Sequence, residues 1–508
     1  MATLPQMATL AQMAWTAPRR CKRPRRSPAQ QTQSGPQNMN VEPSTLERQL
    51  QSCLDAGHGR PWQSGLELQA PWLAGAQPPG VALRALFDVQ DGRIRLLLTD
   101  RIAEADALLD DGAGTSGPER LERIAAALDS TLLDPDAPCA LRRRAVAKPW
   151  GQELWYTGIE TRAVCAVAAP PAADRTDGRR RTKARDGEIP LPWLLAALPS
   201  RFGGIDAPVL LKILDPHAEP VRGDLYFELH ERKQEVYVVT GIDPRAWPDG
   251  RGAARMGFDI ERIRALGDAG LRRAFSAAVA AYRPLRNRID ALLDVQRETE
   301  GIAADAVVDP DRARRWEQRL PADLLALERL LRADIEALTA LEPLRVGDVV
   351  EVPRRVPHAL QHGVRVVEFQ TPAYERQILY FGQKVLTQGH WDTEQALARM
   401  LLRPPAARPA VVEHAIDGAR AERIVDFEDF HVLRIRLAPG ACCPLPSAGH
   451  AVLMGIEGRV LIGNADAGPE EALLIPGAVL RQGVRADDGP ATCLVALPGR
   501  GAHPEHEA

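Results

Sequence analysis

The arrangement of apolar and polar positions along the chain predicts strands in several stretches and helices between two of them. Apolar and polar residues alternate before Gly241, and beta character returns over residues 344–380 and again over residues 423–497. Between these stretches, residues 255–342 place apolar side chains at helical spacing. One such stripe consists of Leu324, Leu327, Leu331, Ile335 and Leu338. The pattern predicts a mainly β protein with two β units and a helical insertion in the first.

The chain before these units has a different character. Residues 46–147 are expected to form a small α/β region. In this region, residues 81–87 and 93–98 have the pattern of a β-hairpin, and apolar residues recur at helical spacing over residues 102–109 and 118–133. We find no candidate chemistry here and expect a structural role.

Two segments lack a hydrophobic period. Residues 1–45 combine a cluster of Arg and Lys with Pro, Gln and Ser, which predicts a disordered basic tail, and Met39 is an alternative start. Residues 168–187 are rich in Pro, Ala and Arg, which predicts a long surface loop.

The composition restricts the kind of partner. Among the 508 residues, 64 Lys and Arg nearly cancel 67 Asp and Glu, so the electrostatic attraction that a nucleic acid requires is missing. The sequence contains no run that approaches the ~20 apolar residues of a membrane span. Seven cysteines without a Cys-x-x-Cys pair indicate neither a disulfide framework nor a cysteine-based zinc site. We therefore expect a cytoplasmic protein with a small-molecule partner and neither a nucleic-acid nor a membrane partner; its oligomeric state stays open.

The polar residues between Gly223 and Gly241 are the most informative in the chain. Two strands of a hairpin are predicted here, at residues 225–230 and 235–239. In such a hairpin His230 lies opposite Glu235, and Glu228 lies opposite Tyr237. Because side chains alternate along a strand, the two carboxylates, the imidazole and Tyr226 then share one face. A divalent cation uses such donors when rigid strands hold them, although an exposed hairpin with a salt-bridging face would explain the same residues.

A second segment favours the metal site. The spacings in this chain are Gly223-x4-Glu228-x-His230-x4-Glu235-x5-Gly241 and Gly347-x5-Pro353-x4-His358. They resemble the two signature motifs of the cupin family, with Glu in place of the leading His of the first motif. Arg355 and His362 depart from the second motif, which has a small residue and Asn at these positions.

Further landmarks narrow the resemblance. They are residues 148–155, residues 209–215, the Lys233-x-Glu235 pair, residues 352–360 and residues 367–372. In this order they resemble type I mannose-6-phosphate isomerases over roughly residues 146–380. The resemblance implies two cupin-type β jelly rolls. The expected division is a metal-binding unit of residues 148–254 and 343–410, the helical insertion 255–342, and a second, metal-free unit of residues 411–508.

The resemblance also implies a ligand set and a substrate site. The implied metal ligands are Glu228, His230, Glu235 and His358, where the family has Gln in place of Glu228. Zinc is the expected ion, with Mn and Fe as alternatives because Glu adds an anionic oxygen. Lys233 and Arg376 are the candidate catalytic cations, although an ungapped match puts Ile378 at the family's catalytic Arg. Tyr226 stands where the family has a Ser that touches phosphate.

Three functions agree with these features. The first is a metal-dependent aldose–ketose isomerase, of the mannose-6-phosphate isomerase type, that acts on a sugar or sugar phosphate. The second is a metal-containing cupin that binds a small carbohydrate in a regulatory or scaffolding role without catalysis. The third is oxidative chemistry at a redox metal.

Overall fold

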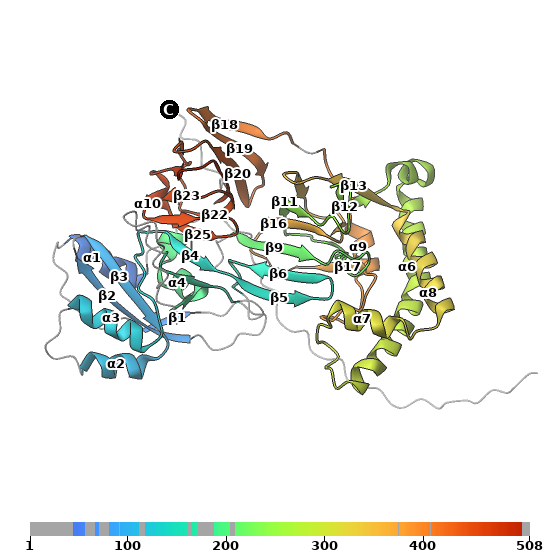
Figure 1. Cartoon of the computed structure of the whole chain (residues 1–508), viewed down its shortest axis with the longest axis horizontal. Coiled ribbons are helices and arrows are strands. Elements are labelled where there is room, and N and C mark those ends of the chain that lie inside the picture. The colour runs from blue at the N-terminus through green and yellow to red at the C-terminus, as the bar shows by residue number, and fades with distance from the viewer. Residues whose placement is uncertain are drawn as a thin grey trace, which may run out of the picture. The chain divides into compact units, whose positions relative to one another are not determined.

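The computed structural model describes residues 44–55, 67–70, 81–90, 92–110, 117–159, 164–170, 187–203, 209–373, 375–406 and 408–499. In these residues the fold is mainly β, with five antiparallel sheets and a helical insertion, as the sequence predicts (Figure 1). Residues 1–43 of the predicted tail and residues 171–186 of the predicted loop lie outside the described residues.

Residues 44–133 contain the expected hairpin and helices. The elements are α1 (Thr45–Asp55), β1 (Glu67–Ala70), β2 (Val81–Gln90), β3 (Arg93–Thr99), α2 (Ile102–Asp110) and α3 (Gly117–Ala127). α1 begins inside the segment predicted to be disordered, because the Ser44 Oγ accepts from the Glu47 backbone N–H while the Glu47 carboxylate accepts from that of Ser44. α3 ends before the predicted residue 133. Asp129 there adopts a φ of 48°, and Ser130 N donates to the Ala125 carbonyl, as in a Schellman end.

Two sheets form the first β unit. The five-stranded sheet contains β13 (Thr339–Leu344), β12 (Gly252–Phe258), β15 (His358–Leu360), β10 (Phe227–Leu229) and β17 (Gln377–Tyr380), in that order. The six-stranded sheet contains β14 (Val349–Val352), β11 (Glu235–Ile242), β16 (Val364–Gln370), β9 (Leu210–Pro216), β6 (Gly151–Trp155) and β5 (Arg144–Lys148). Both sheets contribute to one apolar cluster, for example Met256 and Leu360 from the first and Val350 and Val366 from the second. The two sheets therefore face each other across a shared interior. β5 begins before the expected boundary at residue 148.

The insertion consists of α6 (Ile260–Thr299), α7 (Pro310–Glu317) and α8 (Ala322–Glu336). Asp259 caps α6 by accepting from Arg262 N, and the helix is kinked at Gly267, whose φ is 68°. Residues 255–258 and 339–342 were expected in the helical segment but belong to the paired strands β12 and β13. This pairing brings the two ends of the insertion together.

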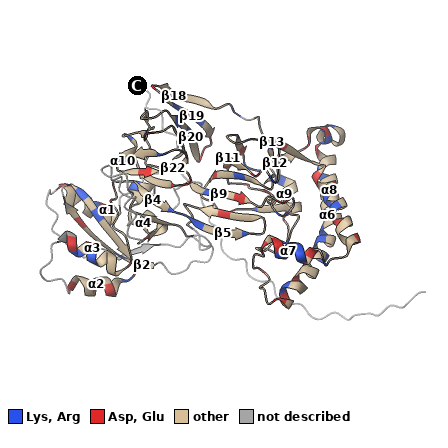
Figure 2. Ribbon diagram, in the orientation of Figure 1, with Lys and Arg blue, Asp and Glu red and all other residues tan. Residues whose placement is uncertain are grey.

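The insertion covers the outer face of the five-stranded sheet. Phe227 and Leu229 of β10 pack in one buried cluster with Phe275 of α6 and Ile335 of α8, beside α9 (Thr393–Arg399) (Figure 1). The polar sides of α6, α7 and α8 carry charges of both signs (Figure 2). The insertion is thus part of the core on this side of the sheet.

The second β unit also consists of two sheets. The nine-stranded sheet contains β18 (Val411–Ile416), β19 (Ala419–Asp426), β20 (Phe430–Leu437), β27 (Ala491–Pro498), β22 (His450–Glu457), β25 (Ala472–Pro476), β4 (Cys139–Arg142), β7 (Ala166–Ala168) and β8 (Ile189–Pro190). The four-stranded sheet contains β21 (Cys442–Cys443), β26 (Val484–Ala486), β23 (Val460–Ile462) and β24 (Ala465–Ala467). Three strands from before residue 191 thus complete a sheet that was expected from residues 411–508 alone. The short helices α4 (Leu191–Ala197), α5 (Pro199–Phe202) and α10 (Gly477–Leu480) lie between strands. In the described part of the chain, no helix combines the length and hydropathy needed to cross a membrane.

Candidate metal centre

Three candidate ligands meet on neighbouring strands of the five-stranded sheet. β10 pairs with β15 so that Glu228 and His358 are direct cross-strand partners, and His230 follows the end of β10 on the same face as Glu228. One ligand atom from each of Glu228, His230 and His358 lies within 4.8 Å of the other two. The structure therefore brings these three predicted residues together.

The route by which they meet differs from the predicted hairpin. β10 and β11 belong to different sheets, so Glu228 and His230 do not pair across strands with Tyr237 and Glu235. The connecting residues bond to other segments instead. The His230 carbonyl accepts from Arg355 N at 2.6 Å, and the Glu375 carboxylate accepts from the backbone N–H groups of Glu231 and Arg232. The chain thereby crosses from one sheet to the other.

Glu235 approaches the same point from the six-stranded sheet. Its carboxylate oxygens lie 3.4 Å from His230 Nε2 and 3.3 Å from His358 Nε2. The Tyr237 hydroxyl donates to Glu235 at 2.8 Å, and Lys233 Nζ lies 2.5 Å from its other oxygen. All four predicted metal ligands thus converge between the two sheets, although Glu235 is already paired with Lys233 and Tyr237.

Four buried atoms at this point have no hydrogen-bond partner among the described residues. They are Glu228 Oε2, both ring nitrogens of His230, and His358 Nε2. His358 Nδ1 lies 3.0 Å from the Val356 carbonyl, which places the proton on Nδ1 and leaves the Nε2 lone pair facing Glu235. Buried polar atoms without partners are costly, and a bound cation would satisfy three of them, namely Glu228 Oε2, His230 Nε2 and His358 Nε2. The donor set of two imidazoles and two carboxylates fits a divalent transition metal.

The charges of the site follow from burial and from Lys233. Burial, aided by the Lys233 ammonium, lowers the pKa of His230 to about 3, so this imidazole is neutral at pH 7 and can offer a lone pair. Burial alone would raise the pKa of the Glu235 carboxyl, but the Lys233 ammonium is the main opposing charge, and this pKa lies well below the usual range. Burial raises the pKa of Glu228 despite the nearby Arg376 and Lys233.

Both predicted catalytic cations lie at the site. Lys233 is buried and directed at Glu235, although its backbone lies in the connection between the sheets. The Arg376 guanidinium stacks on the Tyr226 ring at 4.7 Å, and its Nε lies 3.7 Å from Glu228 Oε2 without a hydrogen-bond partner. Arg376 Nη2 donates to Thr387 Oγ1 at 2.5 Å. Arg376 therefore lies at the site, although an ungapped match of the sequence puts Ile378 at the family's catalytic Arg. Ile378 itself is in the apolar cluster.

A row of buried charged residues crosses the six-stranded sheet beside the site. The sequence did not predict that these residues would lie there. Tyr237 pairs in register with Glu368, which pairs with Lys212, and Lys212 Nζ lies 3.2 Å from Glu368 and 3.6 Å from Glu153. Burial and the nearby Glu235 raise the pKa of Glu368 well above its usual range. The signal in the sequence is a lone charged residue inside an otherwise apolar strand, as at Lys212 and Glu368.

Comparison with known proteins finds structural neighbours but no match by sequence. No protein-family model and no curated protein sequence matches the chain. Its structural neighbours are mannose-6-phosphate isomerases. The enzyme from Bacillus subtilis shows 14% identity and a TM-score of 0.48 over 71% of this chain and 99% of its own. A putative mannosephosphate isomerase from Archaeoglobus fulgidus shows 11% identity and a TM-score of 0.42 over 72% of this chain and 98% of its own. A mannose 6-phosphate isomerase bound with zinc and yttrium shows 14% identity and a TM-score of 0.43 over 72% of this chain and 100% of its own. Function is therefore inferred from the residues of the site itself.

Proposed function

We propose that this protein is a metal-dependent aldose–ketose isomerase that acts on a sugar or a sugar phosphate. The observation that carries the proposal is the group of buried, unpartnered donor atoms on Glu228, His230 and His358. Together with Glu235 they would hold one divalent cation, with zinc as the first candidate and Mn or Fe as alternatives. When bound, such an ion supplies Lewis-acid stabilisation of the negative charge that develops on sugar oxygens as a proton moves between C1 and C2.

Arg376 is suited to bind the substrate. Its Nε is a buried donor without a hydrogen-bond partner, and its guanidinium is held in place by the Tyr226 ring and by Thr387. A positioned guanidinium of this kind binds an anionic or developing anionic oxygen strongly in a water-poor site. Arg376 would therefore orient the sugar against the cation.

Lys233 has a supporting role in this proposal. Its ammonium neutralises one oxygen of Glu235, so that the site carries less negative charge than its carboxylates alone would give. This also keeps Glu235 ionised, because the pair holds the pKa of that carboxyl low. An ionised Glu235 can offer an oxygen to the cation at neutral pH.

Tyr226 bears on substrate choice. Its ring is buried between Phe381, at a centroid distance of 4.2 Å, and Arg376. The ring occupies volume that a smaller residue would leave free for a bulky anionic group such as phosphate. We therefore expect an unphosphorylated sugar to be the better substrate.

The test is an isomerase assay with mannose and mannose 6-phosphate on the purified protein, after removal of metal and reloading with Zn, Mn or Fe. Turnover should require the added ion. Arg376→Lys should lower kcat/KM at least tenfold with metal content unchanged, and the exposed His390→Ala serves as the control. Tyr226→Ser should raise activity on the phosphorylated sugar relative to the free sugar. Stoichiometric metal without turnover of any sugar would favour the non-catalytic carbohydrate-binding function.

A further inference from the structure

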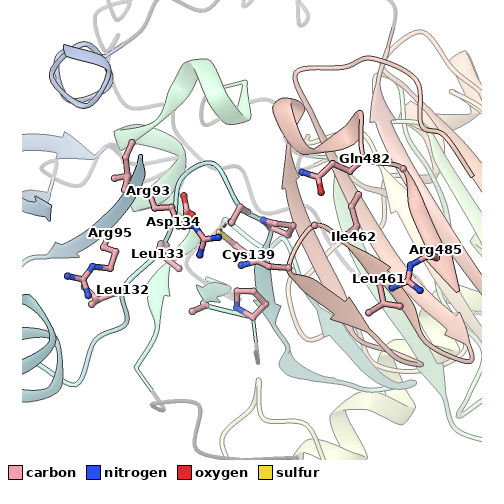
Figure 3. A pocket seen from close by; sticks show the side chains of 18 of the residues that line it. Arg93, Arg95, Leu132, Leu133, Asp134, Cys139, Leu461, Ile462, Gln482 and Arg485 are labelled. Carbon is pink, nitrogen blue, oxygen red and sulfur yellow. Dashed lines mark hydrogen bonds between the residues drawn. The ribbon is translucent and has the colours of Figure 1, made fainter. Parts of the chain in front are cut away.

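A large cleft lies outside the first β unit. Its volume is about 1120 Å³, and its walls come from β3, from residues 132–139 and from the four-stranded sheet of the second β unit (Figure 3). None of its lining residues belongs to the two sheets that hold the candidate metal centre. The cleft is therefore separate from that centre. It lies between the N-terminal α/β region and the second β unit, and no chemistry has been assigned to either of them.

One wall is the outer face of the four-stranded sheet. Val484 and Ala486 of β26 are buried in the interior of the second β unit, so Arg485 between them points outward into the cleft. In register with Arg485 lie Cys442 on β21 and Leu461 on β23, which line the same wall. Among the described residues, no carboxylate forms an ion pair with Arg485.

The opposite wall carries two more guanidinium groups. Ile94 is buried in the core, whereas its neighbours Arg93 and Arg95 line the cleft. Glu122 and Asp88 hold Arg95, with Arg95 Nε donating to Asp88 at 2.9 Å and Nη1 to Glu122 at 3.2 Å. Arg93 is exposed and forms no ion pair within the described part of the chain.

Two of the three arginines that line the cleft, Arg93 and Arg485, form no ion pair among the described residues, whereas Asp88 and Glu122 neutralise Arg95. Among the described residues that line the cleft, Asp134 is the one carboxylate, and it lies on the side of Arg93 and Arg95 (Figure 3). Guanidinium groups without an ion pair on a concave surface attract anions. Gln482 and Asn464 add neutral hydrogen-bond donors.

The apolar part of the lining restricts the ligand further. It is aliphatic and includes Leu132, Leu461 and Ile462, and none of the lining residues that the structure describes carries an aromatic ring on which a base could stack. The volume exceeds the ~300–1,000 Å³ of common small-molecule sites, so a small ligand would share the cleft with water. We infer that this cleft binds a small organic anion with two or more carboxylate or phosphate groups on an aliphatic skeleton, held by Arg93 and Arg485.

The test is titration calorimetry on the full chain with citrate, fructose 1,6-bisphosphate and inorganic phosphate as probes, in ~150 mM salt so that screened, non-specific attraction is suppressed. Citrate and the bisphosphate distinguish carboxylate from phosphate recognition. At least one of these two should bind with one-to-one stoichiometry. Arg485→Ala and Arg93→Ala should each weaken that binding about tenfold, as expected for loss of a charge-assisted hydrogen bond. Inorganic phosphate should bind more weakly than the multivalent probe.

Two controls separate this inference from its alternatives. Arg481→Ala removes an exposed arginine next to α10 that does not line the cleft, and it should leave binding unchanged. His230→Ala should also leave binding unchanged, because the metal centre is a different site. Absence of binding by citrate and the bisphosphate would overturn the inference, and so would equal weakening in Arg481→Ala or loss of binding in His230→Ala.

Discussion

The two β units share a two-sheet arrangement but differ in what lies between the sheets. In the first unit the interior contains Glu235, Lys212 and Glu368 as well as apolar side chains. In the second unit the interior cluster is apolar, with residues such as Leu433 and Ile435. The buried carboxylate described in the second unit, Glu422, faces away from this cluster and binds Arg434 and Arg436.

The difference shows that the same two-sheet arrangement can enclose either charged or purely apolar side chains. Buried charges are costly unless they are paired, and in the first unit Lys212 pairs with both Glu368 and Glu153. The second unit buries only apolar area between its sheets, which favours folding at about 25 cal/mol per Å². We therefore expect the first unit to respond to metal, charge and pH, and the second to respond to packing alone.

The largest expected effect concerns metal content. His358→Ala removes one buried nitrogen donor and should reduce bound divalent metal from about one per chain to near zero, as measured by elemental analysis after gel filtration. The matched control is His450→Ala, which removes a buried histidine of the second unit. Unchanged metal in His358→Ala, or equal loss in His450→Ala, would contradict the assignment.

The next effect concerns the charge row. Lys212→Met keeps the side-chain volume but leaves Glu368 and Glu153 without their shared cation, which should lower the free energy of unfolding by about 3 kcal/mol. Urea unfolding followed by tryptophan fluorescence measures this loss without a signal from residues 411–508, because these residues contain no tryptophan. A loss below about 1 kcal/mol would mean that the row is solvated in solution.

A third effect depends on pH. Burial raises the pKa of the Glu153 carboxyl, but Lys212 and Lys148 outweigh it and lower the pKa from 4.5 to about 2. Because the folded-state pKa lies below the unfolded value, this carboxylate stabilises the fold above pH ~5 and loses its effect as pH falls towards 2. The stability difference between the wild type and Glu153→Gln should therefore shrink by about 2 kcal/mol between pH 6 and pH 3.

Urea unfolding at the two pH values measures this difference. The same substitution at the exposed Glu457 of the second unit controls for the loss of one carboxyl group. A stability difference that stays constant from pH 6 to pH 3 would show that Glu153 is not held ionised by its lysines.

The smallest effect belongs to the second unit. Ile435→Val removes one buried methyl group and should cost about 1 kcal/mol, with no change in metal content or in pH dependence. Hydrogen exchange measured by mass spectrometry should show faster exchange in β19, β20 and β27, which are hydrogen-bonded neighbours. Faster exchange in β10 or β15 instead would show that the two units do not respond independently.

The sequence predicted the elements and the faces of the first unit better than their pairing. Alternation correctly separated Phe227 and Leu229, which pack under the insertion, from Glu228 and His230, which face the interior. The hairpin prediction was wrong. The polar turn is compatible with local pairing of the two strands, but in the structure they belong to different sheets. The alternative depends on Glu375 and Arg355, far along the chain, which bind the connection. Pairing between distant strands is a tertiary property that alternation does not encode.

The candidate site could likewise be predicted only in part from the sequence. The resemblance placed His358 and Glu235 near His230 and named Arg376 as a candidate cation, although an ungapped match puts Ile378 at the family's catalytic Arg. Only the fold shows that Arg376 reaches Glu228 while Ile378 packs in the apolar cluster. Glu368 and Lys212 were visible as charges in apolar strands, yet their proximity to Glu235 depends on the order of β11, β16 and β9.

The position of the insertion between β10 and β15 has a consequence for how fast the protein matures. Glu228 and His358 become cross-strand partners only after α6, α7 and α8 have been synthesised, because the insertion lies between them in the chain. Contacts between distant parts of a chain form slowly, because the entropy of closing the intervening loop must be overcome first. A complete ligand set would therefore exist only late in folding, so capture of the cation should mark the end of maturation rather than guide its early steps.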